Sequence, residues 1–133
     1  MPYQLNPQQL EAVQRTDGPV LILAGAGSGK TRVITHRIAY LIQERRILPE
    51  HILAVTFTNK AAEEMQQRVR QLLGSLSGPL WLSTFHTACA RILRREAATL
   101  NLSPQFVIYD TSDQVALIKQ CVNELRIDQE LYP

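Results

Sequence analysis

Apolar residues along the chain form short continuous runs that are separated by stretches of helical spacing. The runs end at turn or polar residues, which predicts buried strands at residues 20–23, 52–57, 80–84 and 106–109. We expect the strand at 52–57 to be buried on both faces. Strands that alternate with helices favour an α/β fold with a parallel sheet, but this pattern leaves the order of the strands open.

Helix boundaries are marked by capping residues. Asn6, Pro7 and Gln9 match a cap, a first helical position and a capping box, and we expect this helix to run to about Arg15. Further helices are predicted at 31–43, from Thr58 or Asn59, from Phe85, and from a capping box at Thr111 and Gln114. The side chains expected to face the core are Ala61, Met65, Val69, Leu72 and Leu73, then Phe85, Cys89, Ile92 and Leu93, then Val115, Ile118, Cys121, Val122 and Leu125.

The run at residues 20–23 leads into a glycine-rich loop, Ala24-Gly25-Ala26-Gly27-Ser28-Gly29, followed by Lys30 and Thr31. Glycines allow positive φ, so backbone N–H groups and a helix N-terminus can surround a phosphate chain. A lysine at this position reaches the outer phosphates, and the threonine hydroxyl can bind Mg²⁺. The alternative is a glycine-rich turn with an incidental lysine, since Ala24 replaces the first glycine of the strict motif.

Composition is that of a globular chain with a core, at 45% hydrophobic and 20% charged residues. The net charge of +2 does not by itself indicate a nucleic-acid partner, although residues 30–46 hold five basic side chains against one Glu. No apolar run approaches the ~20 residues of a membrane span, and no secretory signal is visible. Cys89 and Cys121 are predicted to be reduced core residues of a cytoplasmic protein.

Polar and aromatic residues follow two of the predicted strands. Phe57 comes after one strand, and Phe85 with His86 after another, at the strand ends where ligands gather in parallel sheets. The rings either plug the edge of the sheet or form a stacking platform for single-stranded nucleic acid. His86 is either a structural capping residue, a phosphate donor or neither.

Four motifs together resemble the UvrD/Rep/PcrA family of superfamily 1 DNA helicases, which translocate 3′ to 5′ on single strands. They are Leu5-Asn6-x-x-Gln9-x-x-Ala12-Val13, the loop through Arg32, Thr56-Phe57-Thr58-Asn59-Lys60-Ala61-Ala62-x-x-Met65, and Thr84-Phe85-His86. The resemblance covers nearly the whole chain. It implies a RecA-like P-loop NTPase domain that is only partly present, with residues 1–110 in the ATP-binding domain and residues 111–133 starting an inserted helical subdomain.

The resemblance also implies site residues. Gln9 would recognise the adenine, as well as capping its helix, and Lys30 and Thr31 would be the catalytic phosphate and magnesium residues. The ATP site would comprise Gln9 and residues 24–32, with Arg32 near the base or ribose. The DNA contacts would be Phe57, Thr58, Asn59, Thr84, Phe85 and His86. The implied cofactors are ATP and Mg²⁺, and the implied partners are single-stranded DNA and the remaining helicase domains.

The chain departs from the family by lacking an Asp-Glu pair after an apolar strand and the arginines of the second motor domain. We therefore expect it to bind nucleotide without efficient hydrolysis, since an arginine finger alone is worth about 10³–10⁵ in rate. Asp110 follows an apolar run and is a minor candidate for a metal ligand.

Three alternatives remain open at this point. The chain could be the N-terminal part of a helicase–nuclease subunit, a complete small P-loop kinase or GTPase, or a binding module without turnover. The segment Asn59-Lys60-Ala61-Ala62 lacks the aspartate of a guanine-recognition motif, which counts against a GTPase.

Overall fold

The computed structural model describes residues 5–74 and 78–127. The chain forms two compact units, Met1–Ile92 and Leu93–Pro133, which are described separately. In chain order the elements are α1 (Pro7–Gln14), α2 (Lys30–Gln43), the 3₁₀ helix η1 (Pro49–His51), β1 (Leu53–Thr56), α3 (Asn59–Leu73), β2 (Trp81–Thr84), α4 (Phe85–Arg95) and α5 (Thr111–Glu124).

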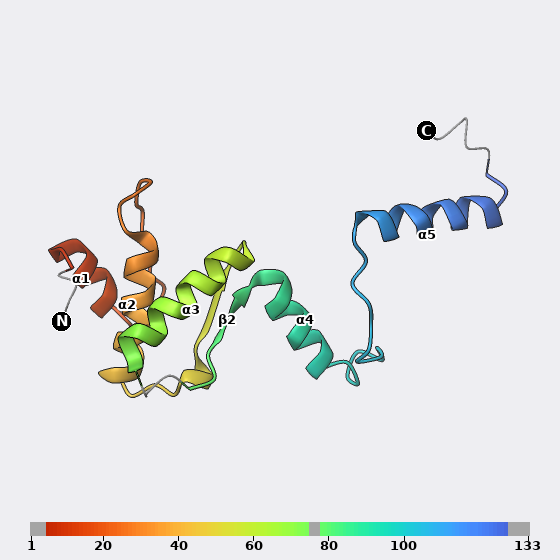
Figure 1. Cartoon of the computed structure of the whole chain (residues 1–133). Coiled ribbons are helices and arrows are strands. Elements are labelled where there is room, and N and C mark those ends of the chain that lie inside the picture. The colour runs from red at the N-terminus through yellow and green to blue at the C-terminus, as the bar shows by residue number, and fades with distance from the viewer. Residues whose placement is uncertain (1–4, 75–77, 128–133) are drawn as a thin grey trace. The chain divides into compact units, whose positions relative to one another are not determined.

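The first unit contains a small parallel sheet. Strands β1 and β2 pair in parallel, and Thr56 lies opposite Thr84 at their carboxyl ends. The connection between them includes α3, which packs on both strands, as Figure 1 shows in yellow and green. Two of the four predicted strands and their parallel pairing are therefore confirmed.

The core of the first unit lies between α2, α3 and the sheet. Its buried cluster comprises Ile38, Ala39, Ile42, Ile52, Ala62, Met65, Val69, Leu73 and Leu82. The expected inner positions Met65, Val69 and Leu73 on α3 are buried, which confirms the helical spacing. This packing fixes α2, whose first residue is Lys30, relative to the carboxyl ends of both strands.

Two predicted strands are absent. Residues 20–23 and 106–109 have no strand pairing in the described structure, and Leu21 and Leu23 are 83% and 87% exposed. An apolar run indicates only that its side chains favour burial, whereas a strand also needs a neighbouring backbone for its hydrogen bonds. The strand β1 is also not buried on both faces, because the side chain of Leu53 is exposed.

The apolar faces predicted for the last two helices are also wrong as core positions. Phe85, Ile92 and Leu93 are exposed on α4, where the buried residues are Ala88 and Ala90. No described residue of α5 is buried. Cys89 and Cys121 are free thiols, but both are exposed and neither lies in a core. Helical spacing identifies the apolar face, and only a packed neighbour buries it.

Helix α5 is capped one residue earlier than predicted. Asp110, not Thr111, is the N-cap, and it forms a capping box with Asp113. The Asp110 carboxylate accepts hydrogen bonds from Ser112 Oγ at 2.6 Å and from the Asp113 N–H at 2.9 Å. This capping role accounts for the aspartate that follows the run at 106–109.

Acidification will loosen the start of α5. The hydrogen bond from the Ser112 side chain, with that from the Asp113 backbone, lowers the pKa of Asp110 below its ordinary value of 3.8. The ionised carboxylate therefore stabilises the helix, and it does so fully at pH values above the unfolded-state pKa. This stabilisation is lost as the pH falls below about 4 and through the folded-state pKa. The protection factors of the Asp113 and Gln114 amides, which are exchange rates relative to the intrinsic rate at each pH, should therefore fall with acid. Asp110→Asn keeps a cap that cannot titrate, so an identical loss of protection in that variant would contradict the assignment.

Candidate functional site

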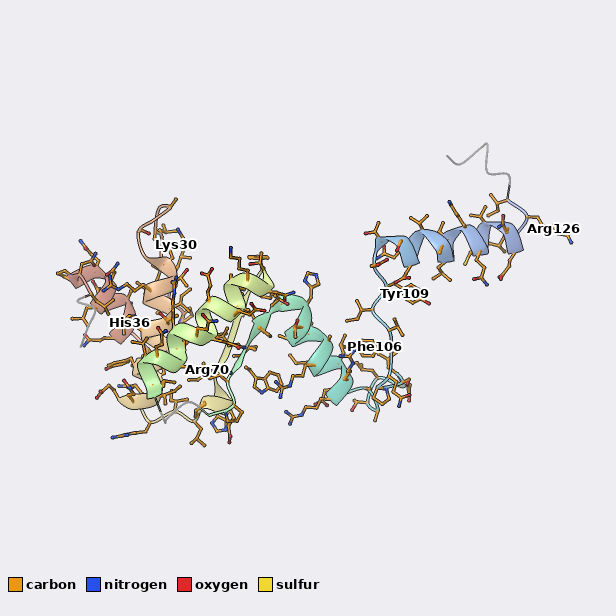
Figure 2. All side chains as sticks on the ribbon, viewed as in Figure 1. Lys30, His36, Arg70, Phe106, Tyr109 and Arg126 are labelled. Atoms are coloured by element: carbon orange, nitrogen blue, oxygen red, sulfur yellow. The ribbon has the colours of Figure 1, made fainter. Side chains whose placement is uncertain are left out.

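The glycine-rich loop leads directly into α2. Gly27 and Gly29 have positive φ angles of 74° and 88°, a conformation that favours glycine, and Gly29 is the N-cap of α2. The helix predicted at 31–43 is confirmed, beginning at Lys30. Figure 2 labels Lys30 where the loop meets the helix. The loop thus presents its backbone beside a helix N-terminus, where the macrodipole favours anions.

The side chain of Lys30 lies against this loop. Its Nζ donates to the carbonyl oxygens of Ala24 at 3.0 Å and Gly25 at 2.6 Å. Ser28 Oγ also donates to Gly25 O at 2.7 Å. An ammonium group has three donors, so these two bonds leave one for an anion. Lys30 is exposed, which makes that donor accessible to a ligand from solvent.

Gln9 joins α1 to the same loop. Its Oε1 accepts from the Asn6 N–H at 3.1 Å, which completes the predicted capping box, and its Nε2 donates to Ser28 O at 3.1 Å. A Cβ added at Gly29 would lie 2.8 Å from Gln9 Nε2, so glycine permits this close approach. An amide oxygen accepts two hydrogen bonds and an amide nitrogen donates two, so half of the capacity of Gln9 remains for a ligand.

These residues fit a nucleoside triphosphate with Mg²⁺. A Cβ at Gly25 or Gly27 would meet no atom within 4 Å, so the space beside the loop is open. Thr31 and Arg32 lie in the first turn of α2 and are half-buried, and Ala26 is exposed on the loop. No group of three or more His, Cys, Asp or Glu residues gathers as a metal site in residues 5–74 and 78–127. Thr31 carries a hydroxyl oxygen, a group of the kind that binds Mg²⁺.

An aromatic pair lies at the carboxyl ends of the two strands. The rings of Phe57 and Phe85 are 5.3 Å apart between centroids and inclined by 45°. Their side chains are 84% and 45% exposed, respectively. The parallel register explains the pair, because the residues after Thr56 and Thr84 emerge side by side. An exposed aromatic pair of this kind offers a face on which planar rings can stack.

The other residues of the two predicted DNA motifs surround this pair in different ways. Thr58 caps α3, its Oγ1 accepting from the Ala61 N–H at 3.2 Å, and Asn59 is the first residue of that helix. Thr84 is buried, and its hydroxyl bonds to Thr87 Oγ1 at 2.9 Å. His86 is exposed in the first turn of α4. Both helices thus begin beside the aromatic pair.

Arg37 has no specific signal in the sequence. This side chain lies on α2 and donates from Nη1 to the Ala12 carbonyl of α1 at 2.7 Å. The helical spacing places Arg37 two turns after Lys30, but only the folded chain shows which carbonyl it meets. The contact connects the helix of the loop to the helix that carries Gln9.

Comparison with known proteins identifies a family and several relatives of this chain. Residues 5–133 match the family described as UvrD/REP helicase N-terminal domain. The chain is 53% identical over 128 residues to "ATP-dependent DNA helicase PcrA" of Bacillus subtilis, which covers 96% of this chain and 17% of that relative. The PcrA helicases of Staphylococcus aureus strain Mu50 and Staphylococcus epidermidis are 51% and 52% identical over the same share of this chain and 18% of their own length. The chain thus spans less than a fifth of these relatives.

Proposed function

The chain belongs to the UvrD/REP helicase N-terminal domain family, and on that premise we propose that it is the ATP-binding portion of a 3′-to-5′ DNA helicase. The parent would use ATP to move along single-stranded DNA in repair or replication. The observation that carries the proposal is that Gln9 from α1 and Lys30 from α2 both bond to the glycine-rich loop. This arrangement supports recognition of a base and a phosphate chain by one site.

Each residue of the loop then has a role toward ATP. Lys30 would bind the outer phosphates with its remaining donor, and the backbone N–H groups of residues 24–29 would surround them. Thr31 would hold Mg²⁺, which neutralises charge on the phosphoryl oxygens when bound. Gln9 would contact the adenine edge, and Arg32 would lie near the base or ribose.

The aromatic pair would contact DNA. Phe57 and Phe85 offer exposed faces for stacking, which tolerates any base sequence. The N-termini of α3 and α4 begin beside the rings, so their dipoles favour DNA phosphates there. Asn59 and His86 lie in those first turns and would donate to phosphate. Thr58 and Thr84 would act mainly by capping, because their hydroxyls already accept hydrogen bonds within the chain.

The small parallel sheet is consistent with part of a RecA-like domain, which we propose as the full fold of the parent. In this proposal residues 1–110 belong to the ATP-binding domain and residues 111–133 begin a helical subdomain.

The chain would bind ATP with little hydrolysis, because it contains no Asp-Glu pair after an apolar strand. A cytoplasmic location is likewise a proposal. In the described residues no helix is long and apolar enough to cross a membrane.

Replacing Gln9 with alanine will test the recognition of the base. We expect ATP affinity to fall and the preference for ATP over GTP to be lost, because the alanine side chain cannot hydrogen-bond to a base edge. The free energy of unfolding should fall by at most about 2 kcal/mol, since Asn6 remains as the cap. The measurements are titrations with fluorescent ATP and GTP, and urea unfolding.

Gln8→Ala is the matched control, since Gln8 is exposed on the same helix turn. It should leave the nucleotide preference unchanged. A Gln9→Ala chain that is less stable but keeps its preference for ATP would show that Gln9 is only a capping residue.

A further inference from the structure

The contact between Arg37 and Ala12 satisfies a carbonyl that α1 leaves without a helical partner. Helix α1 ends at Gln14, and the last carbonyl groups of a helix lack N–H partners within it. The N–H of Arg15 bonds to Glu11 O, and Arg37 Nη1 donates to the next carbonyl, that of Ala12, at 2.7 Å. The guanidinium also places positive charge at the negative end of the α1 dipole.

Helix α1 depends on α2 for its position. It has eight residues, fewer than the ~12–15 that an isolated helix needs to be even marginally stable in water. Val13 is its one buried residue, and its packing neighbour is α2. The half-buried Arg37 bond adds a directional contact to this packing and so helps to fix the position of the helix.

The position of α1 determines where the Gln9 amide lies. Gln9 Nε2 reaches Ser28 O of the loop at 3.1 Å, and a Cβ at Gly29 would already be too close at 2.8 Å. A small shift of α1 would thus break the bond to the loop or bring the amide against it. Figure 2 shows Lys30 at the start of α2, the helix that also carries Arg37 two turns later.

We propose that Arg37 is a positioning residue for base recognition, acting through α1 and Gln9 without touching the nucleotide. The inference rests on the proposed ATP site and adds to it a residue that positions Gln9 and so affects the preference for adenine. Arg37 should affect the choice between ATP and GTP, whereas Lys30 should affect both nucleotides alike, because both carry the same phosphates.

The test compares ATP and GTP binding to the full chain and to Arg37→Met, which keeps the apolar stem and removes every donor. We expect the ratio of ATP to GTP affinity to fall by roughly fivefold or more, the lower end of typical couplings between sites. Arg37→Lys, which retains a donor, should restore part of the ratio. In a Gln9→Ala background, Arg37→Met should cause no further change, because the two residues act in one pathway.

The control is Arg45→Met. Arg45 pairs with Asp17 at 3.5 Å in an exposed ion pair beyond α2, so its loss should leave the ratio unchanged. Equal weakening of both nucleotides in Arg37→Met, or an additive effect with Gln9→Ala, would overturn the positioning role.

Two further readouts separate this inference from the proposed function. If Lys30→Met leaves ATP and GTP binding intact, or the unmodified chain shows no preference for ATP, the ATP site itself is wrong and the inference falls with it. If Lys30→Met weakens both nucleotides while Arg37→Met keeps the ratio, only the inference is overturned. If Arg37→Met does not fold, hydrogen exchange of the unmodified chain provides the test. ATP, but not GTP, must slow the exchange of the α1 amides. Equal exchange rates with both nucleotides would refute the inference.

Discussion

Replacing Lys30 with methionine will lower the affinity for ATP by about a hundredfold. Methionine keeps an apolar stem of similar length but removes the ammonium, whose third donor we assign to the phosphates. Truncating one partner of a hydrogen-bonded charge pair that is buried on binding costs about 2–5 kcal/mol, and each 1.4 kcal/mol is a factor of ten in affinity. The measurement is a titration with fluorescent ATP in the presence of Mg²⁺, with the fold checked by circular dichroism.

Lys119→Met is the matched control, because Lys119 is an exposed lysine on α5 with the same side chain. It should bind ATP like the unmodified chain. A folded Lys30→Met chain with unchanged affinity would make the lysine incidental to a glycine-rich turn, the alternative that the sequence left open.

Replacing Phe57 with alanine will weaken binding of single-stranded DNA tenfold or more in the full-length parent. Stacking of a base on an aromatic ring contributes ~1–3 kcal/mol, and Phe57 is almost fully exposed beside Phe85. The loss should be nearly the same for every base sequence, since each base has a face that can stack. ATP binding should change little, because Phe57 has no assigned phosphate contact. Fluorescence anisotropy of labelled single strands provides the measurement.

Tyr109→Ala is the control for aromatic content, since Tyr109 is an exposed ring on the segment before α5. It should not reproduce the Phe57 effect. Unchanged DNA affinity in a folded Phe57→Ala parent would leave the aromatic pair as a structural plug at the end of the sheet.

Local features of the fold were predictable because neighbouring residues encode them. The capping box of α1 needs only Asn6 and Gln9 three residues apart, and the loop conformation needs glycine at positions of positive φ. The aromatic pair followed from one further rule, that parallel strands bring their carboxyl ends together. Each of these depends on sequence spacing and on a single element or strand pair.

Features that depend on distant partners were not predictable. The runs at 20–23 and 106–109 are as apolar as true strands, yet pairing needs a neighbour that sequence spacing does not identify. The stripes of α4 and α5 likewise indicated an apolar face without showing whether it is covered. The bond from Arg37 to Ala12 joins residues 25 positions apart. Every residue has a backbone carbonyl, so the sequence does not show which one accepts the bond.

The most direct test of the account is a titration of the full chain with Mg²⁺ and ATP, followed by NMR of assigned backbone and side-chain amides. We expect the largest shifts at the amides of Gly25, Gly27, Gly29 and Lys30 and at the Gln9 side chain, with smaller changes on α3. The Lys30→Met chain should show no such shifts at the same ATP concentration. Shifts that are absent from the loop, or confined to other elements, would contradict the assignment of this loop as the ATP site.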